Sequence, residues 1–236
     1  AQRHAQNITA YTVKMPDQSY DETPHAKRIA QHCGVEHKIV ELTDSDVSEA
    51  FGSVADMLDE PLADYSLLPT YMVCRAARKG MTVALSGDGG DELFGGYASF
   101  KAQRLAPLMQ YIPKSIGAGL RGILSLLPNS EGYMNNIFVA QHVSQGFGRP
   151  VDRQNFYWMA PFTDAEKYSL WHDDFRPLGE KAEVFKSIND TNEPTGSIER
   201  LLSQFTRNYL PEDILAKVDR ASMMNSLEVR APFLSR

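Results

Sequence analysis

The sequence predicts an α/β protein, with a parallel sheet in its first part and a mostly helical second part. Short β-branched segments alternate with helical segments up to about residue 97. One of these segments, residues 81–86 (MTVALS), is a continuous apolar run, which is typical of a strand buried on both faces of a parallel sheet. After residue 97 the strand pattern stops and helical periodicity takes over. We therefore divide the chain into residues 1–97 and 98–236.

The elements of the first part follow from local signals. Strands are expected at residues 8–15, 35–42 and 81–86, and helices at residues 21–33, 44–58 and 66–79. The first helix carries Pro24 near its start and Gly34 just past its end, the usual positions for these residues. Thr43 or Asp44 supplies the oxygen that caps the second helix. Because strands and helices alternate, we expect βαβ units and one parallel sheet.

The second part shows helical periodicity with interruptions. Helices are expected within residues 98–127, broken at Pro107 and Pro113, and at residues 133–147 and 198–209. Residues 172–197 are polar and contain two prolines and two glycines, so we expect a loop or linker there.

Composition excludes several classes of function. The 236 residues carry a net charge of −6 and no long basic run, which argues against binding to a nucleic-acid backbone. Only two cysteines occur, Cys33 and Cys74, and they lie far apart, so we expect a reduced, cytoplasmic protein without a disulfide framework. No apolar run approaches the roughly 20 residues that span a bilayer, so no membrane is expected as a partner.

The chemistry is expected in residues 83–97 (VALSGDGGDELFGGY), where a buried strand ends in a glycine-dense, acidic turn. Ligands bind at the carboxyl ends of strands in open α/β sheets. The glycines, Gly87 among them, permit close approach of a ligand to the backbone, and Ser86 offers a hydroxyl. Three carboxylates within five residues (Asp88, Asp91 and Glu92) repel one another unless a cation relieves them, and Mg²⁺ carried by a nucleotide would do so.

Other interpretations of this loop stay open. It could be a surface turn with solvated acids. A calcium loop fits poorly, because DGGDE lacks the alternating ligand spacing of an EF-hand. A phosphate-switched receiver module also gathers acids at strand ends, but two glycine pairs in one loop are not expected there. Neither a Rossmann fingerprint nor a Walker A motif is present.

The segment SGDGGDELFGGY resembles the signature loop of the asparagine synthase family, which also includes β-lactam synthetases. Residues 217–234 (KVDRASMMNSLEVRAPFL) resemble a second block of that family. Residues 59–80 resemble the helix that precedes the signature loop, so the resemblances follow the family order along the chain. The family's SGGxDS phosphate loop, its glutaminase domain with an amino-terminal cysteine and a downstream lysine motif have no counterpart in this sequence.

The resemblance implies a fold and a reaction. The fold would be the parallel-sheet adenine nucleotide α-hydrolase type, or ATP pyrophosphatase, and residues 1–97 would lack its first strand and phosphate loop. The reaction would turn aspartate, ATP and ammonia into asparagine, AMP and pyrophosphate through β-aspartyl-AMP. The ammonia would come from glutamine at the glutaminase domain of the parent protein.

The resemblance also assigns roles to individual residues. Ser86 and Gly87 would contact ATP, Val13 would contact adenine, and Asp91 would hold Mg²⁺. Asp88 stands where many family members have Glu, and it is linked with forming the acyl-adenylate. On the acceptor side, the resemblance implies Glu228 and Arg230.

Three expectations accompany this assignment. The chain alone is expected to be inactive, because the resemblance places its phosphate loop before Ala1. The parent protein could form a homodimer. A related amidotransferase, a β-lactam synthetase acting on another carboxylate, or a non-catalytic nucleotide-binding remnant remain as alternatives.

Overall fold

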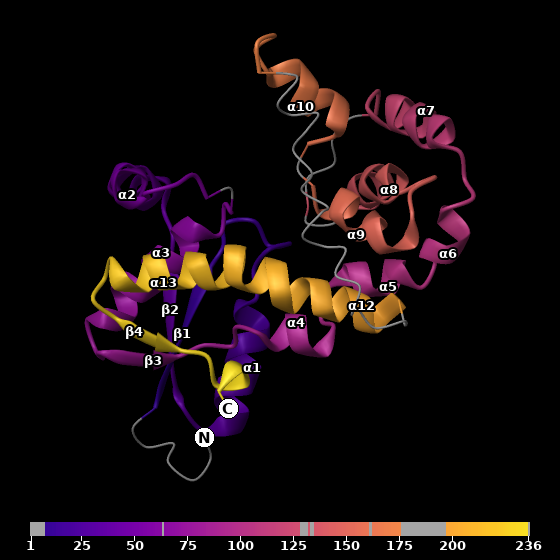
Figure 1. The fold of residues 1–236 in the computed structure, drawn as a ribbon. Coiled ribbons are helices and arrows are strands. Elements are labelled where there is room, and N and C mark those ends of the chain that lie inside the picture. The colour runs from indigo at the N-terminus through magenta and orange to yellow at the C-terminus, as the bar shows by residue number, and fades with distance from the viewer. Residues whose placement is uncertain are drawn as a thin grey trace. The chain divides into compact units, whose positions relative to one another are not determined.

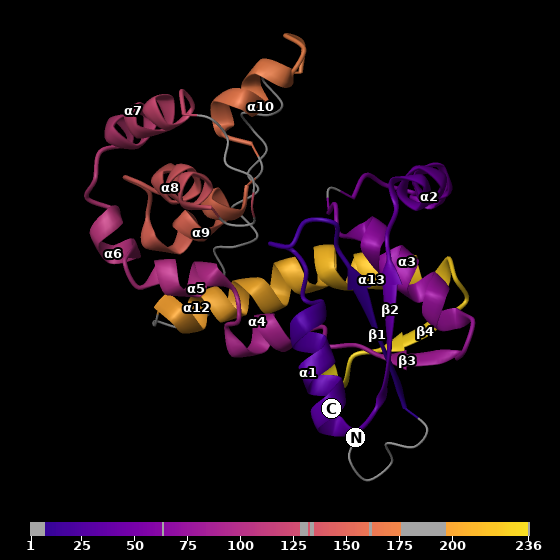
Figure 2. The same cartoon turned by 180° about the vertical axis from the view of Figure 1, so that it is seen from behind.

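The computed structural model describes residues 8–62, 64–127, 132, 135–160, 162–175 and 197–235. The chain forms two compact units (Figures 1 and 2). Unit 1 comprises Ala1–Gly89 and Asn208–Arg236, and unit 2 comprises Gly90–Arg207. This division differs from the expected one at residue 97, because the last segment of the chain packs with the first. Most of the expected loop at 172–197 lies outside the described residues.

Unit 1 contains both kinds of regular structure, so the α/β class is confirmed. Its elements are β1 (Thr9–Lys14), α1 (Thr23–Cys33), β2 (Glu36–Glu41), α2 (Asp44–Met57), α3 (Leu67–Arg78), β3 (Val83–Leu85), α13 (Ala216–Met223), β4 (Glu228–Arg230) and the 3₁₀ turn η3 (Pro232–Leu234). The π-helix η2 (Phe205–Leu215) continues α12 (Ser197–Gln204) and runs into α13.

The strands of unit 1 form two sheets of two parallel strands. β1 pairs with β2 in a register that matches Val13 with Val40, and β3 pairs with β4 in a register that matches Val83 with Glu228. The prediction of a single sheet holding all three expected strands is therefore wrong for the described residues. The neighbour of β3 is β4, a strand of three residues that is too short for alternation to predict.

The core of unit 1 lies around α3. Cys74 and Ala77 of α3 pack with Leu227, and this cluster also contacts Tyr11 of β1 and Val229 of β4. A second cluster joins α2, α3 and α13 through Val54, Leu67 and Ala221. One helix therefore supports both sheets and lies against α13.

Helix ends in unit 1 follow the signals in the sequence. Gly34 ends α1 in the left-handed conformation (φ 65°), which glycine adopts without strain. The Thr43 side chain accepts a hydrogen bond from the Asp46 N–H, and the Asp46 side chain accepts from the Thr43 N–H. This capping box confirms Thr43 as the start of α2.

All regular elements in the described residues of unit 2 are helices. Before α12 it contains α4 (Gly90–Phe94), α5 (Ala98–Gln103), α6 (Ala106–Met109), α7 (Lys114–Leu124), α8 (Asn136–Gln145), α9 (Val151–Met159) and α10 (Asp164–Leu170). Pro107 and Pro113 lie at the starts of α6 and α7, where the missing N–H costs nothing. Phe205, Leu201 and Trp158 are among its buried side chains.

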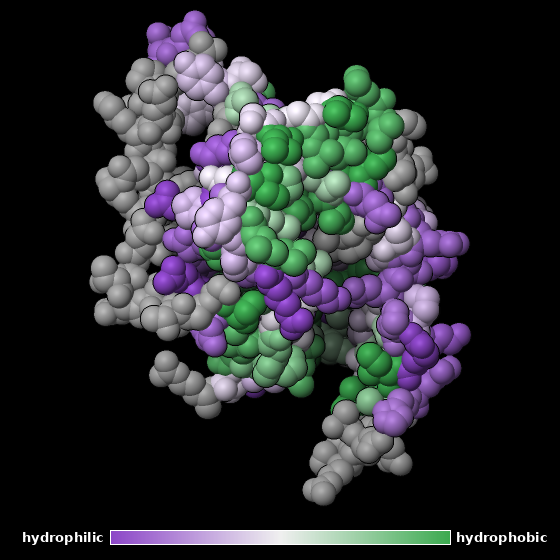
Figure 3. Space-filling model, turned by 90° about the vertical axis from the view of Figure 1, so that its right-hand side faces the viewer, coloured by the Kyte–Doolittle hydropathy of each residue, from purple (hydrophilic) through white to green (hydrophobic). Residues whose placement is uncertain are grey.

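The face of unit 2 that carries α6 and α7 exposes apolar side chains (Figure 3). Leu108, Tyr111, Ile116, Ile123 and Leu126 are all more than half exposed. Within the described part of the chain, no helix combines the length and the hydropathy that crossing a membrane requires.

Candidate functional site

The turn after β3 is held against β4 by backbone hydrogen bonds. The Ser86 N–H donates to the Arg230 carbonyl at 2.9 Å, and the Glu228 N–H donates to the Thr82 carbonyl at 2.9 Å. The Ser86 hydroxyl is buried and has no hydrogen-bond partner among the described residues. Buried hydroxyls are rarely left unsatisfied, so this oxygen is a candidate contact for a ligand.

Two glycines of this turn differ in their surroundings. A side chain at Gly87 would meet no atom within 4 Å, so its backbone faces open space. Gly89 has φ 86°, and a Cβ there would lie 2.5 Å from Leu234 Cδ2. Glycine is therefore required at residue 89 by both conformation and space, whereas residue 87 leaves its backbone accessible.

Asp88 lies in the same turn and is half-buried, and its charge acts on the buried Cys74 of α3. Burial, together with the charge of Asp88, raises the pKa of the Cys74 thiol to about 11. This thiol is neutral near pH 7, which excludes Cys74 as a nucleophile.

Glu228 and Arg230 lie on one face of β4, since they are two residues apart. Arg230 Nε donates to Glu228 Oε1 at 2.7 Å. The Arg230 side chain is 64% exposed and the Glu228 side chain is 57% exposed, so both can reach a ligand. The Ser86–Arg230 hydrogen bond brings the Arg230 backbone next to Ser86, and Glu228 lies opposite Val83 on the paired strand.

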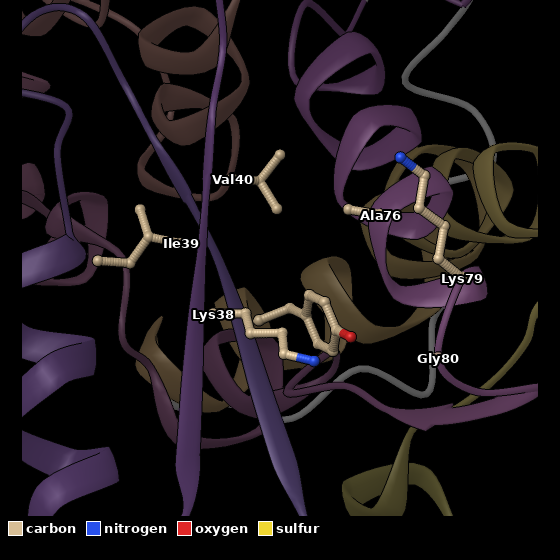
Figure 4. A pocket seen from close by; sticks show the side chains of 7 residues that line it. Lys38, Ile39, Val40, Ala76, Lys79 and Gly80 are labelled. Carbon is tan, nitrogen blue, oxygen red and sulfur yellow. The ribbon is translucent and has the colours of Figure 1, made fainter.

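Val13 lies in the other sheet, and a hollow of about 430 Å³ borders this sheet (Figure 4). The hollow is lined by Tyr11, Lys38, Ile39, Val40, Ala76, Lys79 and Gly80. Val40 is the register partner of Val13 and points toward Ala76 of α3 in Figure 4. Lys38 lies over the Tyr11 ring, 5.8 Å from its centroid. An apolar wall and two ammonium groups therefore border the strand that carries Val13.

In unit 2, the second half of the signature loop folds around Asp91. The N–H groups of Gly95 and Gly96 both donate to the Asp91 carbonyl, at 2.8 and 3.0 Å. Gly95 has φ 69°, and a Cβ at Gly96 would overlap the Asp91 carboxylate. The paired glycines therefore let the chain turn back closely over this acid.

The neighbouring acids have different environments. Glu92 is only 2% exposed and accepts a hydrogen bond from the Tyr97 hydroxyl. Tyr97 in turn stacks on Phe205, with ring centroids 5.0 Å apart. Asp91 remains exposed, and its pKa is raised by partial burial of the carboxylate and by the charge of Glu92. A cation beside Asp91 would relieve this repulsion.

The three acids of the loop differ in exposure: Asp88 is half-buried, Asp91 is exposed and Glu92 is buried. The described residues contain no group of three or more His, Cys, Asp or Glu side chains arranged to hold a metal ion. Asp91 alone offers an exposed carboxylate in its half of the loop, and Glu92 is part of the packing.

The family model for asparagine synthase matches residues 1–236, the whole chain. The chain belongs to the asparagine synthase family. A putative glutamine-hydrolysing asparagine synthetase of Mycobacterium bovis is 28% identical over 98% of this chain and 34% of its own length. A second such protein, from Methanocaldococcus jannaschii, is 31% identical over 91% of this chain and 40% of its length. Amidase chyE of Penicillium rubens is 25% identical over 97% of the chain and 35% of its length. The chain thus spans about a third of the length of these relatives.

Two residues take structural roles that the sequence does not predict. Glu92 is expected as one of three clustered carboxylates, but it is buried, and the aromatic Tyr97 five residues later is the signal for its buried partner. Leu234 reads only as part of an apolar ending, but it packs on Gly89. Contacts between segments so distant in sequence cannot be inferred from local pattern.

Proposed function

We propose that this chain forms the ATP-using part of an amide ligase that makes asparagine from aspartate, ATP and ammonia. The observation that carries the proposal is the unsatisfied Ser86 hydroxyl, at the carboxyl end of β3 and next to the open backbone of Gly87. Family membership supports the ligase class and an ATP pyrophosphatase fold. The names of the relatives indicate the product, asparagine, and glutamine hydrolysis as the ammonia source.

The reaction has two steps. An oxygen of the aspartate side-chain carboxylate attacks the α-phosphorus of ATP, and pyrophosphate leaves with its bridging oxygen. Ammonia then attacks the acyl carbon of β-aspartyl-AMP, and AMP leaves with the oxygen that came from the carboxylate. No protein nucleophile is needed, which agrees with the high pKa of Cys74.

The hydrogen bonds of the turn refine the role of each donor. The Ser86 N–H is occupied by the Arg230 carbonyl, so Ser86 would contact ATP through its hydroxyl alone. Backbone contact to a phosphate would then come from the exposed Gly87. The Ser86–Arg230 hydrogen bond holds the backbone that carries these donors, and donors held in place before the ligand arrives stabilise developing charge best.

Carboxylates complete the proposed site. Asp91 would hold Mg²⁺, since its side chain is exposed, and a cation there would offset the partial burial and the Glu92 charge that raise its pKa. Mg²⁺ would neutralise phosphate charge during attack. Asp88 would favour formation of the acyl-adenylate, and Asp88→Asn is expected to slow that step more than it weakens ATP binding.

The acceptor and the nucleotide would contact different strands. Arg230 would attract the acceptor carboxylate, and Glu228 would hold Arg230 in place and face the ammonium group of an amino acid. The adenine ring would lie beside Val13, against the apolar wall that includes Val40. A glutaminase domain, a possible homodimer and a cytoplasmic location belong to the same proposal. The free cysteines, Cys33 and Cys74, agree with a reducing compartment.

Pyrophosphate release tests the proposal in the protein that carries this chain. Ser86→Ala should raise the KM for ATP about 10- to 100-fold, the loss expected for one hydrogen bond to a charged group. Ser99→Ala is the matched control, because the Ser99 hydroxyl is also buried without a partner among the described residues but lies in α5. If the two substitutions change the KM for ATP equally, Ser86 is not part of the ATP site. A panel of carboxylates would identify the acceptor.

A further inference from the structure

Lys217 of α13 makes a nearly buried ion pair with a segment far away in the sequence. Lys217 Nζ lies 2.9 Å from Asp64 Oδ2, and each of the two side chains is only 12% exposed. Lys217 also donates to Ser66 Oγ at 2.8 Å. The Ser66 N–H and hydroxyl both donate to Asp64 Oδ1, at 2.8 and 2.7 Å. We call these three residues the Lys217 clamp, and each charged group in it contacts both of the other residues.

The charge of Lys217 faces more than one carboxylate. Burial works against ionised Asp64, but hydrogen bonds from Ser66 and Lys217 hold its pKa below the usual range. The pKa of nearby Asp213 is raised by burial and by the charge of Asp64, although Tyr209 and Lys217 act in the opposite direction. Loss of the lysine charge would therefore leave two carboxylates facing each other in a poorly solvated place.

The clamp joins the two helices that lead into β3 and β4. Ser66 immediately precedes α3, which is followed by β3 and then by Ser86. Lys217 lies in the first turn of α13, which is followed by β4. A further bond joins the same helices, since Asn225 Nδ2 donates to the Tyr71 carbonyl at 3.2 Å. A shift of α13 along α3 would thus move β4 along β3.

We infer that Lys217 is a positioning residue for the acceptor side of the proposed site, acting through Asp64 and Ser66 to hold β4 in register with β3. The register determines where Glu228 and Arg230 lie relative to Ser86. The role in acceptor binding rests on the proposed function, but the effect on strand register does not.

Arg220 provides a matched control on the same helix. It lies one turn after Lys217 and contacts Asp59 at 2.7 Å and Glu60 at 3.1 Å. The side chains of these partners are 80% and 71% exposed, so the pairs are screened by solvent. Arg220→Met removes one cation from α13, as Lys217→Met does, without exposing a buried carboxylate.

The experiment compares Lys217→Met, Lys217→Arg and Arg220→Met in the protein that carries this chain. The first readout is hydrogen exchange of the Ser86 and Glu228 amides, whose bonds to Arg230 and Thr82 report the register. The second is the KM for aspartate and for ATP in pyrophosphate release. Lys217→Met should speed both amides about tenfold relative to the β1–β2 amides and raise the KM for aspartate about tenfold. The KM for ATP should stay within about twofold.

The variants separate positioning from general stability. Lys217→Arg should keep both the amide exchange rates and the KM for aspartate close to wild type. Arg220→Met should change neither quantity. Uniformly faster exchange in both sheets of Lys217→Met, or an unchanged KM for aspartate, would overturn the inference. If Lys217→Met does not fold, the double variant Lys217→Met with Asp64→Asn removes both charges and allows the same measurements. The two proposals can fail separately. If the wild type releases no pyrophosphate with any carboxylate, the proposed function is refuted. Faster exchange of the Ser86 and Glu228 amides in Lys217→Met would then still support the role of Lys217 in strand register.

Discussion

Gly89→Ala should destabilise unit 1 through two separable causes. Positive φ at a residue other than glycine costs about 1–2 kcal/mol, and Gly89 has φ 86°. The new Cβ would also lie 2.5 Å from Leu234 Cδ2. Leu234 is only half-buried and can turn aside, so we assign about 1–2 kcal/mol to this overlap. The free energy of unfolding should therefore fall by about 2–4 kcal/mol.

Two other glycines isolate these contributions in urea unfolding followed by circular dichroism. Gly34 has φ 65°, but a Cβ added there would meet no atom within 4 Å, so Gly34→Ala reports the cost of φ alone. Gly87 has neither feature, and Gly87→Ala should be within about 0.5 kcal/mol of wild type. Adding Leu234→Ala to Gly89→Ala should recover the overlap energy. If Gly89→Ala costs no more than Gly34→Ala, the packing of Leu234 on the signature loop is wrong.

Three further predictions concern single side chains. Gly96→Ala should displace the Asp91 carboxylate and, like Asp91→Asn, raise the Mg²⁺ concentration needed for half-maximal pyrophosphate release; wild-type Mg²⁺ dependence in both would refute the metal assignment. Asp213→Asn should raise the thermal midpoint at pH 7. The pKa of Asp213 is raised in the folded protein, so ionisation of this carboxyl destabilises the fold as the pH rises through that pKa. This gain should vanish below about pH 3.9, where the aspartate is protonated in both states, and a gain independent of pH would contradict it. Tyr97→Phe should cost about 1–3 kcal/mol in urea unfolding, since buried Glu92 loses its donor, and an unchanged midpoint would count against that bond.

Local patterns in the sequence predict most elements of unit 1. β-branched runs locate β1 and β2, and the glycine and threonine signals locate the ends of α1 and α2. Pro107 is expected to break a long helix, and it lies where a new one begins. These features depend on residues within a few positions of each other, so periodicity and capping rules are sufficient.

Pairing between distant segments could not be predicted in the same way. The residues EVR of β4 carry no alternation signal, and their partner β3 lies more than a hundred residues earlier. The bond between Lys217 and Ser66 spans 151 residues. Such contacts depend on how helices pack, which local propensity does not encode.

The candidate site was predicted in part. The resemblance located the signature loop, and β3 ends where the loop begins, as expected. The expectation that this strand is buried on both faces is wrong, because Val83 and Leu85 are 41% and 73% exposed. The sequence could not show that the Ser86 N–H is already occupied or that Glu92 is buried, because both depend on tertiary contacts. The roles assigned to Val13, Asp88, Asp91 and Glu228 stay predictions.

The most direct test of the proposed chemistry follows an oxygen atom. Aspartate labelled with ¹⁸O in its side-chain carboxylate is supplied with ATP, Mg²⁺ and ammonia to the protein that carries this chain. Attack of the carboxylate on the α-phosphorus predicts one ¹⁸O in AMP and none in pyrophosphate. Unlabelled AMP, or label in inorganic phosphate released with ADP, would contradict adenylation at this site.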